Sequence, residues 1–245
     1  MQKIIISLFA CFLLFGCEEK RTNHLLVATS ADYPPFEFFK NGEIVGFEID
    51  LINAIAKEIS HTITIKDMSF DTIIGALQNQ RIDLAISNIT ASPERQEKVD
   101  FTIPYHRTLS VMIVSSQSPI AKPTDLKGKN LGVQMGSVYE KMVKDEWQPV
   151  ISNLTLRSLS KVPDLIQDFK VGRLDAIVLG ITEGKNIVAS HSEFKLVLLP
   201  ETEAITAIAL PKNSSLTDKI NDIIKKFEAD GTLSKLRIKW MESEQ

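Results

Sequence analysis

Arg95 stands in the first turn of a predicted helix, where a guanidinium can hold an anion. In "TASPERQ" (residues 90–96), Ser92 is suited to cap the helix and Pro93 to occupy its first position. The backbone N–H groups at a helix N-terminus favour negative charge, and arginine offers a two-pronged match to a carboxylate. The spacing therefore predicts a carboxylate-binding site. An arginine exposed to solvent, or paired within the protein, would give the same sequence.

A second helix start, at Ser137, has the same character. Glu140 follows three residues later, which is the spacing of a capping box. The free N–H groups near Val138 could meet the same anion from the other side. We therefore expect two helix starts, far apart in the sequence, to share one ligand.

Aromatic residues are concentrated around Pro34 and Pro35, in "ADYPPFEFFKNGEIVGFEIDL" (residues 31–51). We expect the Pro-Pro pair to hold this loop rigid, with Phe36 and Phe38 facing inward. A rigid aromatic ring can pack on an alkyl chain or accept a cation over its face. Ordering the ring in advance lowers the entropy cost of binding.

The helix and strand patterns that would position these residues occur twice in the sequence. A helical pattern at Phe70, Ile73, Ile74 and Leu77 recurs without a gap 92 residues later, at Val162, Leu165, Ile166 and Phe169. In the same register, the strand pattern "RIDLAIS" (residues 81–87) falls on "RLDAIVL" (residues 173–179). Upstream, "LLVATSA" (residues 25–31) has a counterpart in "LGVQMGS" (residues 131–137). The pattern indicates two halves with the same architecture.

Each half reads strand–helix–strand–helix–strand, which predicts an α/β fold with parallel strands and helices on both sheet faces. Ligands of such sheets lie beyond the carboxyl ends of the strands. Extended runs at residues 108–116 and 204–212 are predicted to cross between two lobes, and the helical residues 215–240 to return to the first. We therefore place lobe 1 at residues 25–108 plus 206–245, and lobe 2 at residues 109–205.

The N-terminus differs from the rest of the chain. Lys3 precedes an apolar run, residues 4–15, that is too short to span a bilayer and suits a signal peptide. The run ends in "LFGC" (residues 14–17), which resembles a bacterial lipobox. We expect a signal peptide at residues 1–16, palmitate attached at Cys17, and a lipidated linker over residues 17–24. An ordinary secretory signal, or an uncleaved anchor, would leave Cys17 without a role.

Four segments together resemble the polar amino-acid-binding proteins of ABC importers, of the arginine, lysine, histidine and glutamine type. They are "DYPPFEFFKNGEIVGFEIDL", "SNITASPERQEKVDFTIPY", "LGVQMGS" and "GRLDAIV". The likeness covers about residues 25–240. It implies a periplasmic-binding-protein-like fold of type II, with two α/β lobes joined by two crossover strands in a Venus flytrap. The implied partners are an amino acid, an ABC permease in the inner membrane, and the membrane itself through the N-terminal lipid.

The resemblance also implies roles for particular residues. Arg95 and Thr90 would hold the ligand α-carboxylate, with help from Ser137 and the Val138 backbone. Tyr33 and Phe70 would sandwich the ligand side chain, although helical spacing also suits Phe70 to a core. Three further positions would line the pocket: Ser30, Asn88 and Gln134. Gln134 is similar to arginine-type binders, so arginine or a related cationic amino acid is favoured.

Two positions depart from the family pattern. An acidic residue usually follows the second-lobe strand and binds the ligand α-ammonium, and here that residue is Gly180. Glu183 would substitute if a helical turn begins there. Ser30 stands where binders of cationic amino acids often carry Asp. If Glu183 does not substitute, the α-amino group is held differently or the ligand is not a standard α-amino acid. Both changes weaken the prediction of a cationic amino acid.

Other classes of function have less support in the sequence. The net charge of −3, without a basic run, gives no indication of nucleic acid. The histidines are scattered, so we expect neither a metal site nor a cofactor, and we expect a monomer that is not an enzyme. The first alternative is an enzyme like the cyclohexadienyl dehydratases, which share this fold, with an acid such as Glu183 as general acid. The second is a sensor domain on the same fold.

Overall fold

The computed structural model describes residues 23–242 of the chain. The predicted signal peptide at residues 1–16 and the predicted lipid attachment at Cys17 lie outside these residues. No helix among the described residues has both the length and the apolar character needed to cross a membrane.

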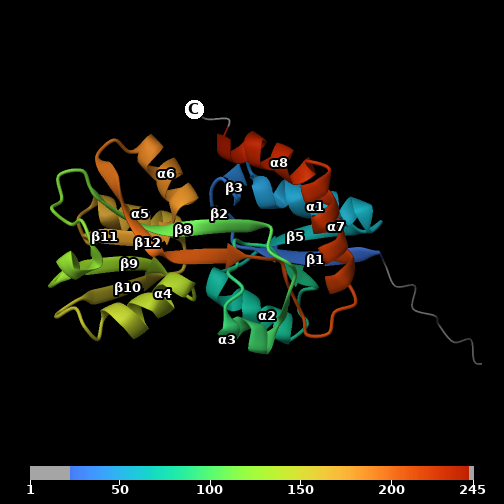
Figure 1. Cartoon of the computed structure of the whole chain (residues 1–245), viewed down its shortest axis with the longest axis horizontal. Helices are drawn as coiled ribbons and strands as arrows, with labels where there is room; N and C mark the ends of the chain where they lie inside the picture. Colours follow the sequence, from blue (N-terminus) through green and yellow to red (C-terminus); the bar gives the residue numbers. More distant parts are fainter. Residues whose placement is uncertain (1–22, 243–245) are drawn as a thin grey trace, which may run out of the picture.

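Two five-stranded sheets form the centres of two lobes, which lie side by side along the longest axis (Figure 1). The first sheet has the order β5-β1-β6-β13-β7. Its strands are β1 (His24–Thr29), β5 (Thr62–Asp67), β6 (Leu84–Ala85), β7 (Asp100–Phe101) and β13 (Ala209–Leu210). The second sheet has the order β10-β9-β11-β8-β12. Its strands are β8 (His106–Ser115), β9 (Asn130–Gln134), β10 (Thr155–Leu159), β11 (Ala176–Gly180) and β12 (Phe194–Thr206).

The repeat found in the sequence corresponds to the first three strands of each sheet. In the first lobe β1 pairs in parallel with β5 and β6, and in the second β9 pairs in parallel with β10 and β11. The parallel pairing predicted for the repeated units is confirmed, and the remaining strands pair in the antiparallel direction. β13 and β7 are antiparallel in the first sheet, as are β8 and β12 in the second.

The two lobes are joined where β8 and β12 run together. These strands pair from Phe194 opposite Ser115 to Thr206 opposite His106, and Figure 1 shows them reaching from the second lobe toward the first. The first extended run lies close to its predicted place. The second begins earlier than predicted, because β12 starts at Phe194 and β13 is a separate short strand.

Helices cover both faces of each sheet, as the alternation predicts (Figure 1). In the first lobe, α1 (Phe47–Glu58), α7 (Thr217–Ala229) and α8 (Thr232–Arg237) lie on one face, and α2 (Ile73–Gln78) and α3 (Pro93–Lys98) on the other. In the second lobe, α5 (Val162–Lys170) and α6 (Ile181–Ser190) lie opposite α4 (Val138–Met142). Four further helical segments are short: Phe70–Thr72, Pro123–Leu126, Val143–Trp147 and Ile238–Glu242.

The C-terminal helices return to the first lobe and complete its core. Ile220, Ile224 and Phe227 of α7 are buried, at the spacing that the sequence predicts. Gly231 separates α7 from α8 in a left-handed conformation, with φ of 79°. Glycine adopts this conformation without steric cost. The Nε1 of Trp240 donates to Asp50 of α1 at 2.7 Å, which ties the helical segment Ile238–Glu242 to the first lobe.

The loop that holds the aromatic residues forms a small third sheet, β2-β3-β4. Its strands are β2 (Asp32–Tyr33), β3 (Glu37–Lys40) and β4 (Glu43–Val45). Phe36 is fully buried and packs edge-on against Phe47, at 5.9 Å between ring centroids. Phe38 is partly buried against Trp240. The inward direction predicted for Phe36 is confirmed.

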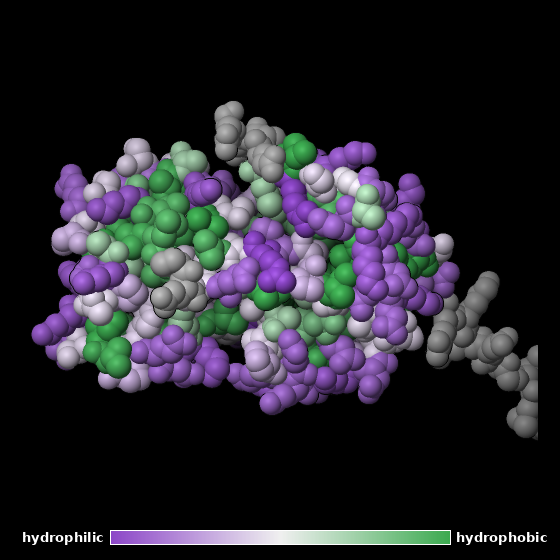
Figure 2. All heavy atoms as spheres, in the orientation of Figure 1, coloured by the Kyte–Doolittle hydropathy of each residue, from purple (hydrophilic) through white to green (hydrophobic). Residues whose placement is uncertain are grey.

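The surfaces of the two lobes differ in polarity on the face shown in Figure 2. Hydrophilic side chains cover most of the first lobe, and hydrophobic side chains gather over part of the second, where β8 and β12 lie. Leu198 of β12 is 58% exposed and Leu109 of β8 is 39% exposed. Neither residue lines the cavity between the lobes.

Candidate functional site

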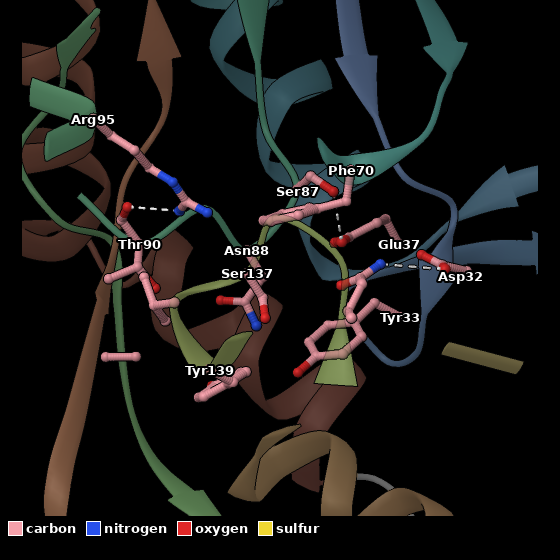
Figure 3. Close-up of a pocket in the computed structure, with 13 residues that line it drawn as sticks. Asp32, Tyr33, Glu37, Phe70, Ser87, Asn88, Thr90, Arg95, Ser137 and Tyr139 are labelled. Atoms are coloured by element: carbon pink, nitrogen blue, oxygen red, sulfur yellow. Dashed lines mark hydrogen bonds between the residues drawn. The ribbon is translucent and has the colours of Figure 1, made fainter. Parts of the chain in front are cut away.

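A small cavity lies between the lobes, at the carboxyl ends of the parallel strands. Its volume is about 20 Å³, which is room for about one water molecule. Residues from both lobes line it (Figure 3): Asp32, Tyr33, Glu37, Phe70, Ser87, Asn88, Thr90, Arg95, Gln134, Ser137, Val138, Tyr139 and Ala204. The structure therefore brings together eight of the nine side chains that the sequence indicates. The exception is Ser30, which does not line the cavity.

Arg95 reaches across from the first lobe to the second. One N–H group of its guanidinium donates to the backbone oxygen of Thr90 at 2.9 Å, and the other donates to the backbone oxygen of Gly136 at 2.8 Å. The guanidinium carbon also lies 5.3 Å from the centre of the Phe70 ring, within cation–π distance. Burial lowers the pKa of Arg95 to about 10, so the group remains charged at pH 7. These two donors lie side by side, so they can donate to a carboxylate in place of the two carbonyl oxygens.

The start of α4 faces Arg95 from the second lobe. Ser137 caps this helix, because its hydroxyl accepts from the backbone N–H of Glu140 at 3.1 Å. The predicted capping box is wrong in one respect. The Glu140 carboxylate accepts from the N–H of Gly136 at 2.6 Å, one residue before the predicted donor, because the N–H of Ser137 is already bonded to the oxygen of Gln134. Ser137 and Val138 both line the cavity.

Tyr33 and Phe70 contribute aromatic surface to the cavity (Figure 3). Tyr33 is only 8% exposed, and its hydroxyl accepts from the N–H of Gly180 at 3.2 Å, across the two lobes. Tyr139 joins them from α4. Sequence reasoning missed Tyr139, since a tyrosine in the first turn of an amphipathic helix gives no particular signal.

Buried carboxyl groups lie across the cavity from Arg95, and sequence reasoning did not single out Glu37 or Glu48. Glu37 lines the cavity and accepts from Ser87 at 3.1 Å. Behind it, Glu48 accepts from the backbone N–H of Asn88 and from the Tyr105 hydroxyl. Burial raises the pKa of Glu37 well above its usual range, and the neighbouring charge of Glu48 raises it further. The available signal was an acidic residue inside each of two apolar runs, "PPFEFF" and "GFEIDL".

Ser30 and Gln134 both contact Asp32, a further residue that the sequence did not single out. The Ser30 hydroxyl donates to Asp32 at 2.9 Å, and the Gln134 amide donates to the other carboxylate oxygen at 3.4 Å. That second oxygen also accepts from the backbone N–H of Val162 at 2.9 Å. Asp32 of the first lobe thereby caps α5 of the second, whose own N-cap residue, Lys161, makes no side-chain cap bond.

Replacing Asp32 with alanine should therefore weaken ligand binding by about 0.5–2 kcal/mol, the usual cost of losing a helix cap. The bond to Val162 exists only while the lobes are together, so its loss favours the open arrangement. Titration calorimetry with the ligand measures the change. Asp164→Ala is a matched control, since it removes an exposed carboxylate from the first turn of the same helix. Equal losses in both variants would mean that Asp32 acts only through the charge at the helix end.

Several buried oxygens around the cavity accept no hydrogen bond. Among the described residues, Oε2 of Glu37, Oδ1 of Asn88 and Oε2 of Glu183 are in this condition. Buried polar groups of folded proteins are almost always hydrogen-bonded, so each such atom requires a reason. All three lie in or behind the wall of one cavity. The site is therefore suited to a ligand that brings several N–H donors at one end and an anion for Arg95 at the other.

Comparison with known proteins gives one consistent result. Residues 25–243 match the family described as bacterial extracellular solute-binding proteins, family 3. The arginine-binding extracellular protein ArtP of Bacillus subtilis is 36% identical, and the match covers 99% of this chain and 95% of the relative. The L-cystine-binding protein TcyJ of Escherichia coli is 32% identical over 90% of this chain and 84% of its own.

Solved structures agree with these relatives. An ancestral arginine-binding protein bound to arginine has a TM-score of 0.84 and is 36% identical, with 89% of this chain and 98% of that chain covered. These proteins are all named as binding proteins of an amino acid, and neither the dehydratase-like enzyme nor the sensor domain is favoured by them.

Proposed function

Because the chain belongs to the bacterial extracellular solute-binding proteins, family 3, and captures an amino acid for an ABC importer, we propose that its ligand is arginine or a related cationic amino acid. The observation that supports this choice is the polarity of the cavity. The Arg95 guanidinium stands at one end, and buried carboxyl groups such as Glu37 stand at the other. An amino acid with a cationic side chain matches both ends.

The site residues keep the roles that the resemblance implies. Arg95 and Thr90 hold the α-carboxylate together with Ser137 and Val138, while Tyr33 and Phe70 enclose the side chain. Asn88 and Gln134 provide further polar contacts. Ser30 acts indirectly in this scheme, by orienting Asp32 through their hydrogen bond.

Entry of the ligand requires the lobes to separate. The cavity of about 20 Å³ is far smaller than the roughly 300–1,000 Å³ of typical ligand sites. We propose a hinge near the ends of β8 and β12, with lobes limited to residues 25–108 plus 206–245 and residues 109–205. A ligand that touches both lobes only in the closed arrangement drives closure.

A ligand panel tests the proposal. The chain without residues 1–16 is titrated with arginine, lysine, histidine, glutamine, glutamate, cystine and several carboxylates that lack an amino group, and thermal unfolding is followed. Tight binding stabilises the native state in proportion to the logarithm of ligand excess. Arginine or lysine is expected to give the largest shift and to be recovered unchanged, as expected of a binding protein that is not an enzyme. A larger shift with cystine or glutamate would reject the cationic ligand.

We further propose that the protein acts as a monomer, outside the cytoplasm, anchored by palmitate at Cys17. The support is the "LFGC" sequence, together with a family of extracellular proteins. This places it in the periplasm, or at the cell surface of a Gram-positive organism. Metabolic labelling with palmitate should mark the full chain, and Cys17→Ser should remove the label. An unlabelled wild-type chain would reject the anchor.

A further inference from the structure

Lys161 of the second lobe lies against two acidic residues of the first. Its Nζ donates to Oδ1 of Asp67 at 3.1 Å and to the hydroxyl of Ser30 at 3.3 Å. The Ser30 hydroxyl donates in turn to Asp32 at 2.9 Å. These four residues form the Lys161 cluster, in which one cation of lobe 2 meets the acids of lobe 1 only while the lobes are together.

Asp32 is the member of the Lys161 cluster that faces the ligand. It lines the cavity, whereas the other three residues of the cluster do not. Figure 3 shows Asp32 and Arg95 on opposite sides of the group of residues that line the cavity. An amino acid whose α-carboxylate binds Arg95 therefore directs its side chain toward Asp32, with Lys161 behind that carboxyl group.

The electrostatics of Asp32 depend on its neighbours in the cluster. Asp32 is only 7% exposed, and burial is the main cause that raises the pKa of its carboxyl group. The N–H of Val162 and the charge of Lys161 act in the opposite direction, while the charge of Asp67 adds to the effect of burial. The side chains of Lys161 and Asp67 are each about one-third exposed, so water screens their charges only in part.

A cationic side chain of the ligand would compete with Lys161 for these acids. Two positive groups that face one carboxylate from opposite sides repel each other, and in a partly buried region this repulsion acts beyond contact distance. A neutral side chain meets no such repulsion. Lys161 therefore lowers the affinity only for ligands whose side chain is positive.

We propose that Lys161 is a specificity-determining residue, which limits the preference of the site for cationic over neutral side chains. It does so by pairing with Asp67 and by opposing, through Ser30, the negative charge that Asp32 presents to the ligand. The inference rests on the proposed function, because it concerns the side-chain end of the same ligand. The site accepts neutral polar amino acids beside cationic ones, in a ratio that this lysine sets.

The test compares L-arginine with L-citrulline, in which an uncharged urea group of nearly the same shape replaces the guanidinium. The ratio of the two affinities in calorimetry isolates the charge of the side chain. Lys161→Met removes the ammonium group and keeps an unbranched apolar chain of similar length. It should raise the ratio by about tenfold, the effect of one unit charge at several ångströms in a partly buried site. If lysine is the tighter ligand, lysine and norleucine replace the pair.

Lys161→Met also removes an ion pair between the lobes, and the ratio cancels this second effect. A partly exposed ion pair contributes little, so both ligands should weaken by the same factor, about fivefold at most. Lys141→Met is the matched control, because Lys141 of lobe 2 faces Glu94 of lobe 1 at 3.9 Å, outside the Lys161 cluster. Its side chain is 60% exposed, so the ratio should stay within about twofold of the wild-type value.

Asp67→Asn changes the charge of the cluster in the other direction. The asparagine keeps an oxygen that can accept from the N–H of Ala31, which donates to Oδ1 of Asp67 at 2.8 Å. The ratio of arginine to citrulline affinity should fall by about tenfold, because Lys161 has lost its counter-charge. The double variant Lys161→Met/Asp67→Asn should return the ratio to about the wild-type value, since the net charge is restored. Misfolding of one variant would not give opposite shifts that cancel.

Two outcomes would overturn the inference while leaving the proposed function intact. In the first, Lys161→Met leaves the ratio of arginine to citrulline affinity unchanged, which means that Lys161 only joins the lobes. In the second, the ratio falls, which means that Lys161 holds the acids in place for a cationic ligand. A wild type that binds neither arginine nor lysine would instead reject the proposed function itself.

Discussion

Replacing Arg95 with alanine should raise the Kd for the amino acid by about two to three orders of magnitude. The guanidinium is the positive group among the residues that line the cavity, and its two N–H groups point to neighbouring carbonyls that a carboxylate could replace. Removing one partner of a buried, hydrogen-bonded charge pair costs about 2–5 kcal/mol, and each 1.4 kcal/mol is a factor of ten. Calorimetry on the purified variant measures the loss directly.

Arg95→Lys separates charge from geometry. Lysine keeps the positive charge but lacks the planar pair of donors, so it should recover only a small part of the lost affinity. The unliganded variants must also be compared by thermal unfolding, since Arg95 donates to Thr90 within its own lobe. An Arg95→Ala protein that binds with near-normal affinity would show that Arg95 is a structural residue paired with backbone carbonyls.

The repeated part of the fold could be predicted because its signal is local. Helical spacing at Phe70 and Val162, and the strand patterns that follow, give the parallel core of each lobe. Arg95 and Ser137 could be found for the same reason, since a helix cap has a recognisable sequence. In contrast, β13 and β7 are two-residue strands that pair only because distant segments meet. No local pattern marks such a pairing.

The acidic wall of the site could not be predicted for a related reason. Glu37 and Glu48 lie in apolar runs whose pattern indicates a strand and a helix, and a sequence does not reveal which buried carboxyl has a partner. Asp32 caps a helix that begins 130 residues later. Its function depends on the closed arrangement of the lobes, which is a property of the tertiary structure.

Gly136→Ala should prevent full closure of the lobes. Gly136 adopts a φ of +74°, and a Cβ atom there would lie 2.7 Å from the Cα and 2.8 Å from the Cβ of Asp71 in the opposite lobe. Ordinary van der Waals contact requires 3.4–4 Å. The backbone of Asp71 cannot move aside as a flexible side chain could, so the lobes must remain about 1 Å further apart. The bond from Arg95 to the oxygen of Gly136 would be strained by the same displacement. We expect ligand affinity to fall by at least tenfold.

Gly128→Ala is the matched control for this variant. Gly128 has a φ of +69°, so alanine meets the same backbone strain there, about 1–2 kcal/mol, but no atom lies within 4 Å of the added Cβ. Both variants should lose similar thermal stability without ligand, while only Gly136→Ala should lose affinity and fail to contract on ligand addition in small-angle X-ray scattering. If Gly136→Ala contracts and binds as the control does, the contact between Gly136 and Asp71 does not limit closure. Because the strain is matched, a difference between the two variants isolates the contact across the lobes, and with it the claim that binding and closure are one event.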